Sequence, residues 1–183
     1  MATVGSPQAL REAVSQKLGT AVRHMHDLRK ALEPEFNGYW NPKDDAVGFL
    51  HAAHGVVPVL KTFADERKQL GDFDDWRDKW EEELTVEERT LWLRMKDERI
   101  AQEHGEGAGL ESFPNPVTRG GEFQDFTNYA AHGIPRGPPP AKEGVRFRAY
   151  PDRPANEVCL QYLGLVGRCW QDFIRDHPHI LPP

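Results

Sequence analysis

The chain has 183 residues, of which 38% are hydrophobic and 28% are charged, as in soluble proteins large enough to bury a core. Its net charge of −6 argues against a protein that coats nucleic acid through a basic surface, although a small basic cleft is compatible with it. No apolar run approaches the roughly 18 residues of a membrane span, and no basic-then-apolar secretion signal opens the chain. We therefore expect one cytoplasmic domain, residues 1–183, without membrane contact.

The first helix is predicted over residues 7–33. A hydroxyl cap and a proline at the first helical position, Ser6-Pro7, open it, and Pro34 closes it. Apolar residues recur every three or four positions along its length, at Leu10, Val14, Leu18, Ala21, Met25, Leu28 and Leu32. Such a stripe is typical of a long amphipathic helix.

The second helix is predicted over residues 43–70, after the cap Asn41-Pro42 and before Gly71. Pro58 lies inside this range, so we expect a kink near His54. His51 and His54 are three residues apart and can share a face. Two histidines make an incomplete metal site, and polar residues that face a cleft are the preferred interpretation.

A short helix follows, capped by Asp72 or Asp74, with Trp76, Trp80 and Leu84 at four-residue spacing. The third long helix is predicted over residues 86–104. Thr85 and Glu88 form a capping box at its start, and Gly105 can end it in a left-handed conformation. This helix carries the sharpest chemical signal in the chain.

Residues 106–152 are rich in glycine and proline and show no helical period, so they are expected to form a long irregular excursion. Residues 145–150 alternate apolar and basic side chains and predict a short strand that can pair with residues 122–126. The last helix is predicted over residues 154–176 and ended by Pro178. Cys159 and Cys169 lie about 15 Å apart along this helix, which predicts free thiols.

The predicted fold class is all-α. Short connections between the early helices favour an antiparallel, up-down four-helix bundle, with an extra short helix and the long irregular excursion before the last helix. No internal repeat and no cofactor-binding motif is evident in the sequence.

The order of these parts, with the stretch LRMKDERIAQEH at the end of the third helix, resembles the HEPN superfamily of helical-bundle domains. The family is marked by an arginine followed after four to six residues by a histidine, and the matching positions here are Arg99 and His104. The chain departs from the family at Ile100, where a polar residue commonly follows the arginine.

The resemblance implies a metal-independent endoribonuclease of the toxin–antitoxin or defence type, acting on RNA and associated with an antitoxin partner. His104 would move protons as acid or base, and Arg99 would hold the phosphate with its planar fork. Five residues along an ideal helix leave two side chains roughly 140° apart. HEPN proteins typically dimerise and place both pairs in one cleft, so a homodimer is expected.

Two alternatives remain open. In the first, Arg99 pairs with a carboxylate, either Glu103 at i+4 or Glu98 and Asp97, and the chain is a non-catalytic HEPN-like binding or dimerisation module. In the second, a helical bundle binds a metal ion through histidines. The residues for that site are His51, His54 and either His104 or His24.

Overall fold

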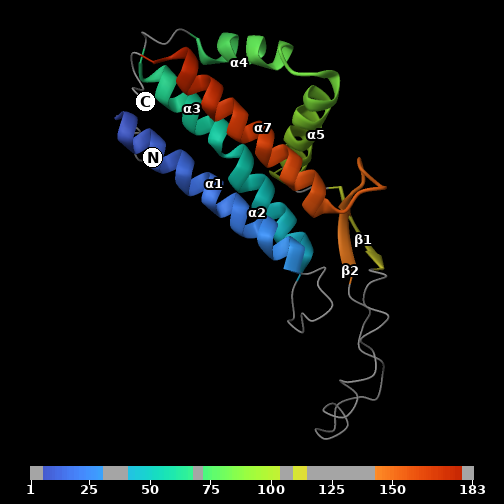
Figure 1. Ribbon diagram of the computed structural model, residues 1–183. Helices are drawn as coiled ribbons and strands as arrows, with labels where there is room; N and C mark the ends of the chain where they lie inside the picture. Colours follow the sequence, from blue (N-terminus) through green and yellow to red (C-terminus); the bar gives the residue numbers. More distant parts are fainter. Residues whose placement is uncertain (1–5, 31–40, 68–71, 104–108, 115–142, 179–183) are drawn as a thin grey trace, which may run out of the picture.

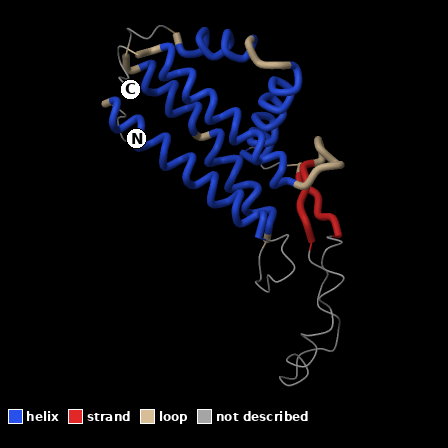
Figure 2. Tube along the Cα trace, viewed as in Figure 1, coloured by secondary structure: helices blue, strands red, loops and turns tan. Residues whose placement is uncertain are grey.

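The computed structural model describes residues 6–30, 41–67, 72–103, 109–114 and 143–178 (Figure 1). These residues form a mostly helical, bundle-like structure with one small two-stranded hairpin at its side (Figure 2). In chain order the elements are α1 (Pro7–Lys30), α2 (Pro42–His54), α3 (Val56–Asp65), α4 (Phe73–Glu82), α5 (Val86–Glu103), β1 (Leu110–Pro114), β2 (Glu143–Phe147) and α7 (Ala155–Asp176).

Helix α1 begins where the sequence predicts. The Ser6 hydroxyl accepts a hydrogen bond from the backbone N–H of Ala9 at 3.1 Å, as expected of a helix N-cap. The predicted stripe supplies its buried side chains, which are Leu10, Val14, Ala21 and Leu28. Helices α2 and α3 return along α1 in the opposite direction (Figure 1). The predicted end of the helix, residues 31–33, lies outside the described residues.

The second predicted helix is divided in two at Gly55, next to the expected kink. Pro58 has no N–H for the carbonyl of His54, so the regular bonding of the helix is interrupted one turn before the proline. The predicted extent to Leu70 is wrong. Helix α3 ends at Asp65, and the N–H of Arg67 bonds to the carbonyl of Ala64 at 2.9 Å in a tighter turn.

The stretch Pro42–Asp65 is long and apolar enough, by length and composition alone, to cross a membrane. Of its apolar 18-residue window, 56% is buried inside the described fold. Core helices of soluble proteins pass the same test, and Phe49, Leu50 and Leu60 of this stretch are fully buried against the other helices.

Helix α4 begins at the predicted cap Asp72, whose side chain accepts a hydrogen bond from the N–H of Asp74 at 2.8 Å. Its Trp80 ring meets Trp92 of α5 edge to face, with the ring centres 4.9 Å apart. Carboxylates satisfy the buried indole N–H groups: Trp80 donates to Asp172 at 2.9 Å. Trp92 likewise donates to Glu81 at 2.8 Å, so the buried carboxylates of Asp172 and Glu81 are part of the core.

Helix α5 confirms its predicted capping box. The N–H of Glu88 donates to the Thr85 hydroxyl at 3.2 Å, and the N–H of Thr85 donates to the Glu88 carboxylate at 3.0 Å. The hydrogen bond from the Thr85 N–H, and the charge and hydrogen bonds of Arg168, hold the pKa of the Glu88 carboxyl below its usual range, since they favour the charged form.

The two strands of the hairpin are antiparallel, with Ser112 opposite Val145. The predicted strand is confirmed over residues 145–147, and residues 148–150 form a turn instead. Its partner is β1, inside the stretch predicted to be irregular, and the expected partner 122–126 lies outside the described residues. Glu111 of β1 pairs across the hairpin with Arg148 at 3.1 Å and with Arg146 at 3.4 Å.

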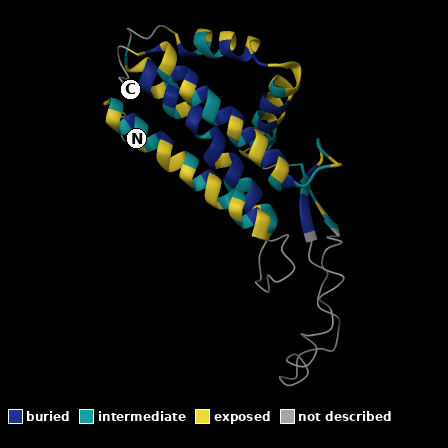
Figure 3. Cartoon of the chain, in the orientation of Figure 1, coloured by how far each residue is buried: buried dark blue, intermediate teal, exposed yellow. Residues whose placement is uncertain are grey.

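Helix α7 runs as predicted and buries one continuous stripe beside α1, α2 and α5 (Figure 3). The stripe comprises Val158, Cys159, Tyr162, Leu165, Val166, Cys169 and Phe173. Both cysteines are free, as predicted. Burial in apolar surroundings raises the pKa of each thiol, so both are protonated and unreactive at neutral pH.

Candidate functional site

Arg99 lies one turn beyond Met95 on the stripe of α5 that faces the other helices. Its side chain is 21% exposed, and Nη2 donates to Oε1 of Glu103 at 2.6 Å. The neighbouring Nε is buried and has no hydrogen-bond partner among the described residues. The guanidinium therefore donates from Nη2 to Glu103, while the adjacent Nε–H donates to no described residue.

The second residue of the predicted pair, His104, lies outside the described residues, which end at Glu103 in this part of the chain. The structure therefore gives no distance between Arg99 and His104. The i+4 contact from Arg99 to Glu103 is the one expected if the arginine stabilises the helix end.

Glu98 does not contribute to the Arg99 contact. Its carboxylate accepts a hydrogen bond from the N–H of Gly109 at 2.6 Å and so joins the end of α5 to the start of β1. It lines a shallow, polar hollow of about 490 Å³ together with Arg94, Asp97 and Arg148. Glu98 thus has a structural partner of its own, and Glu103 is the carboxylate that meets Arg99.

His54 is buried between α2, α5 and α7, and its Nδ1 lies 2.8 Å from the hydroxyl of Tyr162. Burial, and after it the positive charges of Arg99, Lys96 and Arg77, lower the pKa of His54 to about 4. The imidazole is therefore neutral at pH 7. Arg99 lies close enough to act electrostatically on this histidine.

His51 is exposed to solvent on α2, although only three residues separate it from His54. The two side chains therefore do not form a common site. His24 of α1 has a third environment, with its Nδ1 2.8 Å from a carboxylate oxygen of Asp45. Among the described residues, no three histidine, cysteine or acidic side chains gather in a way that could hold a metal ion.

The sequence pattern gives no sign of the partner of His54. Tyr162 lies on the buried stripe of α7, a position that by itself predicts only a core residue. A buried tyrosine hydroxyl needs a hydrogen-bond partner, so its place in the stripe signals that a polar group must lie opposite it. Burial raises the pKa of Tyr162, which keeps its hydroxyl protonated beside the neutral histidine.

The candidate site is thus the C-terminal end of α5, where Arg99 pairs with Glu103 and acts electrostatically on His54 and Tyr162. Comparisons of the chain with protein-family models, with curated proteins and with solved structures found no match.

Proposed function

We propose that this chain is a HEPN-like helical domain, an up-down bundle that acts as a metal-independent endoribonuclease. Arg99 binds the scissile phosphate and His104 transfers the proton, in a cleft shared by two copies of the chain. The resemblance in the order of helices and the Arg99/His104 spacing supports this assignment.

One observation carries the proposal: the guanidinium of Arg99 makes a bond from Nη2 and none from Nε. A single bond joins its guanidinium to Glu103, whose side chain is 43% exposed, and the buried Nε has no partner among the described residues. Exposed i,i+4 ion pairs are worth about 0.3–0.5 kcal/mol, so Glu103 is a weak competitor. A phosphate that approached Nη2 from solvent would compete with Glu103 for the guanidinium.

The chemistry requires no metal ion. His104 as base takes the proton from the ribose 2′-hydroxyl, whose oxygen then attacks the phosphorus while the bond to the 5′ oxygen breaks. Arg99 stabilises the charge that develops on the phosphate oxygens. The protonated His104 returns a proton to the leaving 5′ oxygen, and the other product ends in a 2′,3′-cyclic phosphate.

The same contact favours a second candidate, a non-catalytic binding or dimerisation module. At 2.6 Å the Arg99–Glu103 ion pair satisfies part of the guanidinium within one helix, and the arginine side chain is largely covered. In that case Arg99 stabilises the end of α5 and the chain engages a second copy or a protein partner of the antitoxin type. The histidine metal site receives no such support, since His24, His51 and His54 have separate surroundings.

The test measures cleavage of single-stranded RNA by the purified chain in the presence of a chelator. We expect products with a 2′,3′-cyclic phosphate, loss of most activity in His104→Ala, and strong loss in Arg99→Lys, because a lysine cannot make the two-pronged contact. His51→Ala replaces an exposed histidine of α2 and is the matched control, which should cleave like the parent.

Thermal melting separates the two candidates. A phosphate-binding Arg99 loses activity on substitution at a nearly unchanged melting temperature, and Glu103→Gln keeps or increases RNA cleavage by releasing the fork. A structural Arg99 instead lowers the melting temperature in both variants. Unchanged cleavage in Arg99→Lys and His104→Ala, or a parent that never cuts RNA after its partner is removed, would assign the chain to the non-catalytic class.

A further inference from the structure

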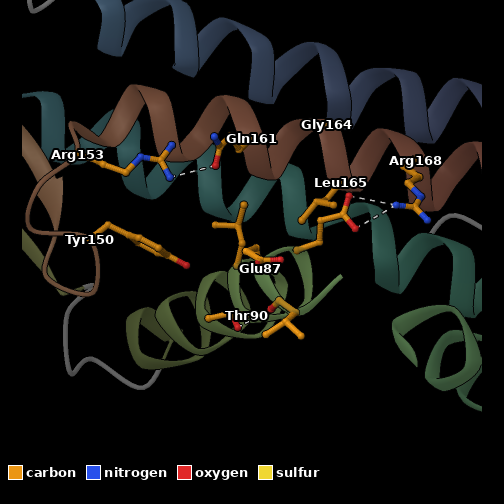
Figure 4. A pocket seen from close by; sticks show the side chains of 11 residues that line it. Glu87, Thr90, Tyr150, Arg153, Gln161, Gly164, Leu165 and Arg168 are labelled. Atoms are coloured by element: carbon orange, nitrogen blue, oxygen red, sulfur yellow. Dashed lines mark hydrogen bonds and ion pairs between the residues drawn. The ribbon is translucent and has the colours of Figure 1, made fainter. Parts of the chain in front are cut away.

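A second feature lies away from Arg99, between the first turns of α5 and the middle of α7. A cavity of about 710 Å³ opens there, a size typical of small-molecule sites. Figure 4 shows it bounded by Glu87 and Thr90 from α5, by Gln161 and Gly164 from α7, and by Tyr150 from the turn after β2. It is therefore built by three segments that are distant in the sequence.

The floor of the cavity is apolar. Leu91 of α5 and Leu165 of α7 are buried beneath it, and Val86 at its rim is 78% exposed. Gly164 contributes no side chain, and a Cβ added there would meet nothing within 4 Å. The body of a ligand in this cavity would accordingly be aromatic or aliphatic, since apolar surface gains free energy when it leaves water.

At one end of the cavity the charges of the lining side chains are neutralised by ion pairs within the protein. Nη1 of Arg168 donates to both carboxylate oxygens of Glu88, at 3.2 and 3.3 Å, and Nε lies 3.4 Å from Asp172. The Glu88 carboxylate is also bonded by the capping box of α5. These groups have their partners in place and need no ligand.

The opposite end contains an unpaired tyrosine hydroxyl beside an arginine. The hydroxyl oxygen of Tyr150 is buried and has no hydrogen-bond partner among the described residues (Figure 4). Arg153 beside it donates to the neutral amide of Gln161 at 3.1 Å, and its contact with the carboxylate of Glu157 is long, at 3.9 Å. Burial raises the pKa of Tyr150, so its hydroxyl remains a donor, while the nearby Arg94 and Arg153 act in the opposite direction.

We infer that this cavity binds a small amphipathic organic monoanion, an aromatic or aliphatic carboxylate or sulfonate, with its anionic group at Tyr150 and Arg153. The apolar body lies over Leu91, Leu165 and the open surface of Gly164. Glu87, the carboxylate in the lining that opposes an anion, is exposed on the first turn of α5 and can turn toward solvent. The positive charge of Arg153 and the free hydroxyl thus match the head of the ligand.

The test titrates the full chain with anilinonaphthalene sulfonate, whose fluorescence rises on leaving water, and with the neutral phenylnaphthylamine of similar shape. Saturable binding of the sulfonate is expected. Arg153→Gln should weaken it about tenfold, the loss of one charge-assisted hydrogen bond, and should change the neutral compound less than about twofold. Tyr150→Phe should act in the same direction. Naphthoate should displace the sulfonate, and naphthol should not.

Gly164→Leu fills the cavity, and Gly167→Leu is its matched control. Both glycines lie on α7 and both have open space where a Cβ would be placed, but Gly167 does not line the cavity. Either substitution replaces a helical glycine and should leave the melting temperature equal or higher. Gly164→Leu should abolish binding of both compounds, and Gly167→Leu should leave both unchanged.

Three results would overturn the inference: equal binding in Gly164→Leu and the parent, equal losses in the two glycine variants, or equal effects of Arg153→Gln on the charged and neutral compounds. A Gly164→Leu chain that does not fold leaves the Arg153 comparison decisive. Arg99→Lys should bind the sulfonate like the parent, so this inference stands or fails separately from the ribonuclease proposal.

Discussion

Two side chains near the end of α5, Arg99 of that helix and His54 at the end of α2, are buried to different depths. Arg99 carries a guanidinium charge and extends it toward Glu103 and solvent. His54 lies deeper and has little access to water, so it gives up its proton instead. The positive charge of Arg99 also lowers the pKa of His54, so the charge state of the histidine depends on this arginine.

The lowered pKa of His54 predicts a pH dependence of stability. The imidazole has a pKa of about 4 in the fold and 6.5 as its ordinary value. Between these values the unfolded chain binds the proton and the folded chain does not, so the free energy of unfolding rises with pH. The part of the free energy of unfolding that depends on His54 is fully present above about pH 6.5 and is lost as pH falls toward about 4. It amounts to roughly 3 kcal/mol.

Urea unfolding at several pH values between 4 and 7 measures this slope. His54→Phe should flatten it, because a group that cannot bind a proton makes no linkage, whatever the variant's overall stability. His51→Phe replaces an exposed histidine one turn earlier and should keep the parent's slope. A slope that survives in His54→Phe would assign the effect to other groups, such as the carboxylate of Glu88.

At the scale of the elements, local signals predicted the helix starts well. The hydroxyl of Ser6, the carboxylate of Asp72 and the Thr85–Glu88 box are short-range interactions, complete within one turn of the helix they open. Strand β1 was missed for the opposite reason. Its five residues have no signal of their own, and they form a strand because Glu111 and its neighbours pair with β2 more than thirty positions later.

The packing of α1 on α2 yields a prediction at this scale. A Cβ at Gly48 would lie 2.6 Å from the ring of His24, which is bonded to Asp45. Gly48→Ala should therefore push the ring off the carboxylate and destabilise the fold by about 1–3 kcal/mol, a typical cost of overpacking. Gains in helix propensity from alanine are smaller, at about 1 kcal/mol.

A double-mutant cycle checks this explanation. In a His24→Ala background the space above Gly48 is vacant, so Gly48→Ala should be neutral or stabilising there. Gly19→Ala on α1, where a Cβ meets nothing within 4 Å, is the control and should stabilise both backgrounds. Equal destabilisation by Gly48→Ala with and without His24 would show that the ring is not the cause.

At the scale of the whole molecule, the candidate site was only partly predictable. The Arg99–Glu103 contact follows from spacing along one helix, and the sequence contained it as an alternative. The His54–Tyr162 bond joins residues 108 positions apart, and the cavity at Tyr150 needs α5, α7 and the turn after β2 together. Such sites depend on tertiary packing, for which a single sequence has no local signal.

The proposed shared cleft makes a prediction for pairs of chains. On an ideal helix Arg99 and His104 would be offset by roughly 140°, which favours a site that takes the arginine from one chain and the histidine from the other. Arg99→Lys and His104→Ala, each inactive alone, should then regain roughly a quarter of the parent's RNA cleavage when mixed after dissociation and reassociation. Random exchange makes about half of the two-fold dimers mixed, and each mixed dimer contains one intact combination.

Light scattering on the same samples verifies that dimers form and exchange. His51→Ala mixed with Arg99→Lys supplies the reference, since one of its chains is fully active and sets the recovery expected from dilution alone. A mixture of the two inactive variants that remains inactive, while dimers exchange freely, would show that arginine and histidine do not combine between chains. A strict monomer at high micromolar concentration would remove the shared cleft altogether, and with it the geometry by which Arg99 and His104 reach one phosphate.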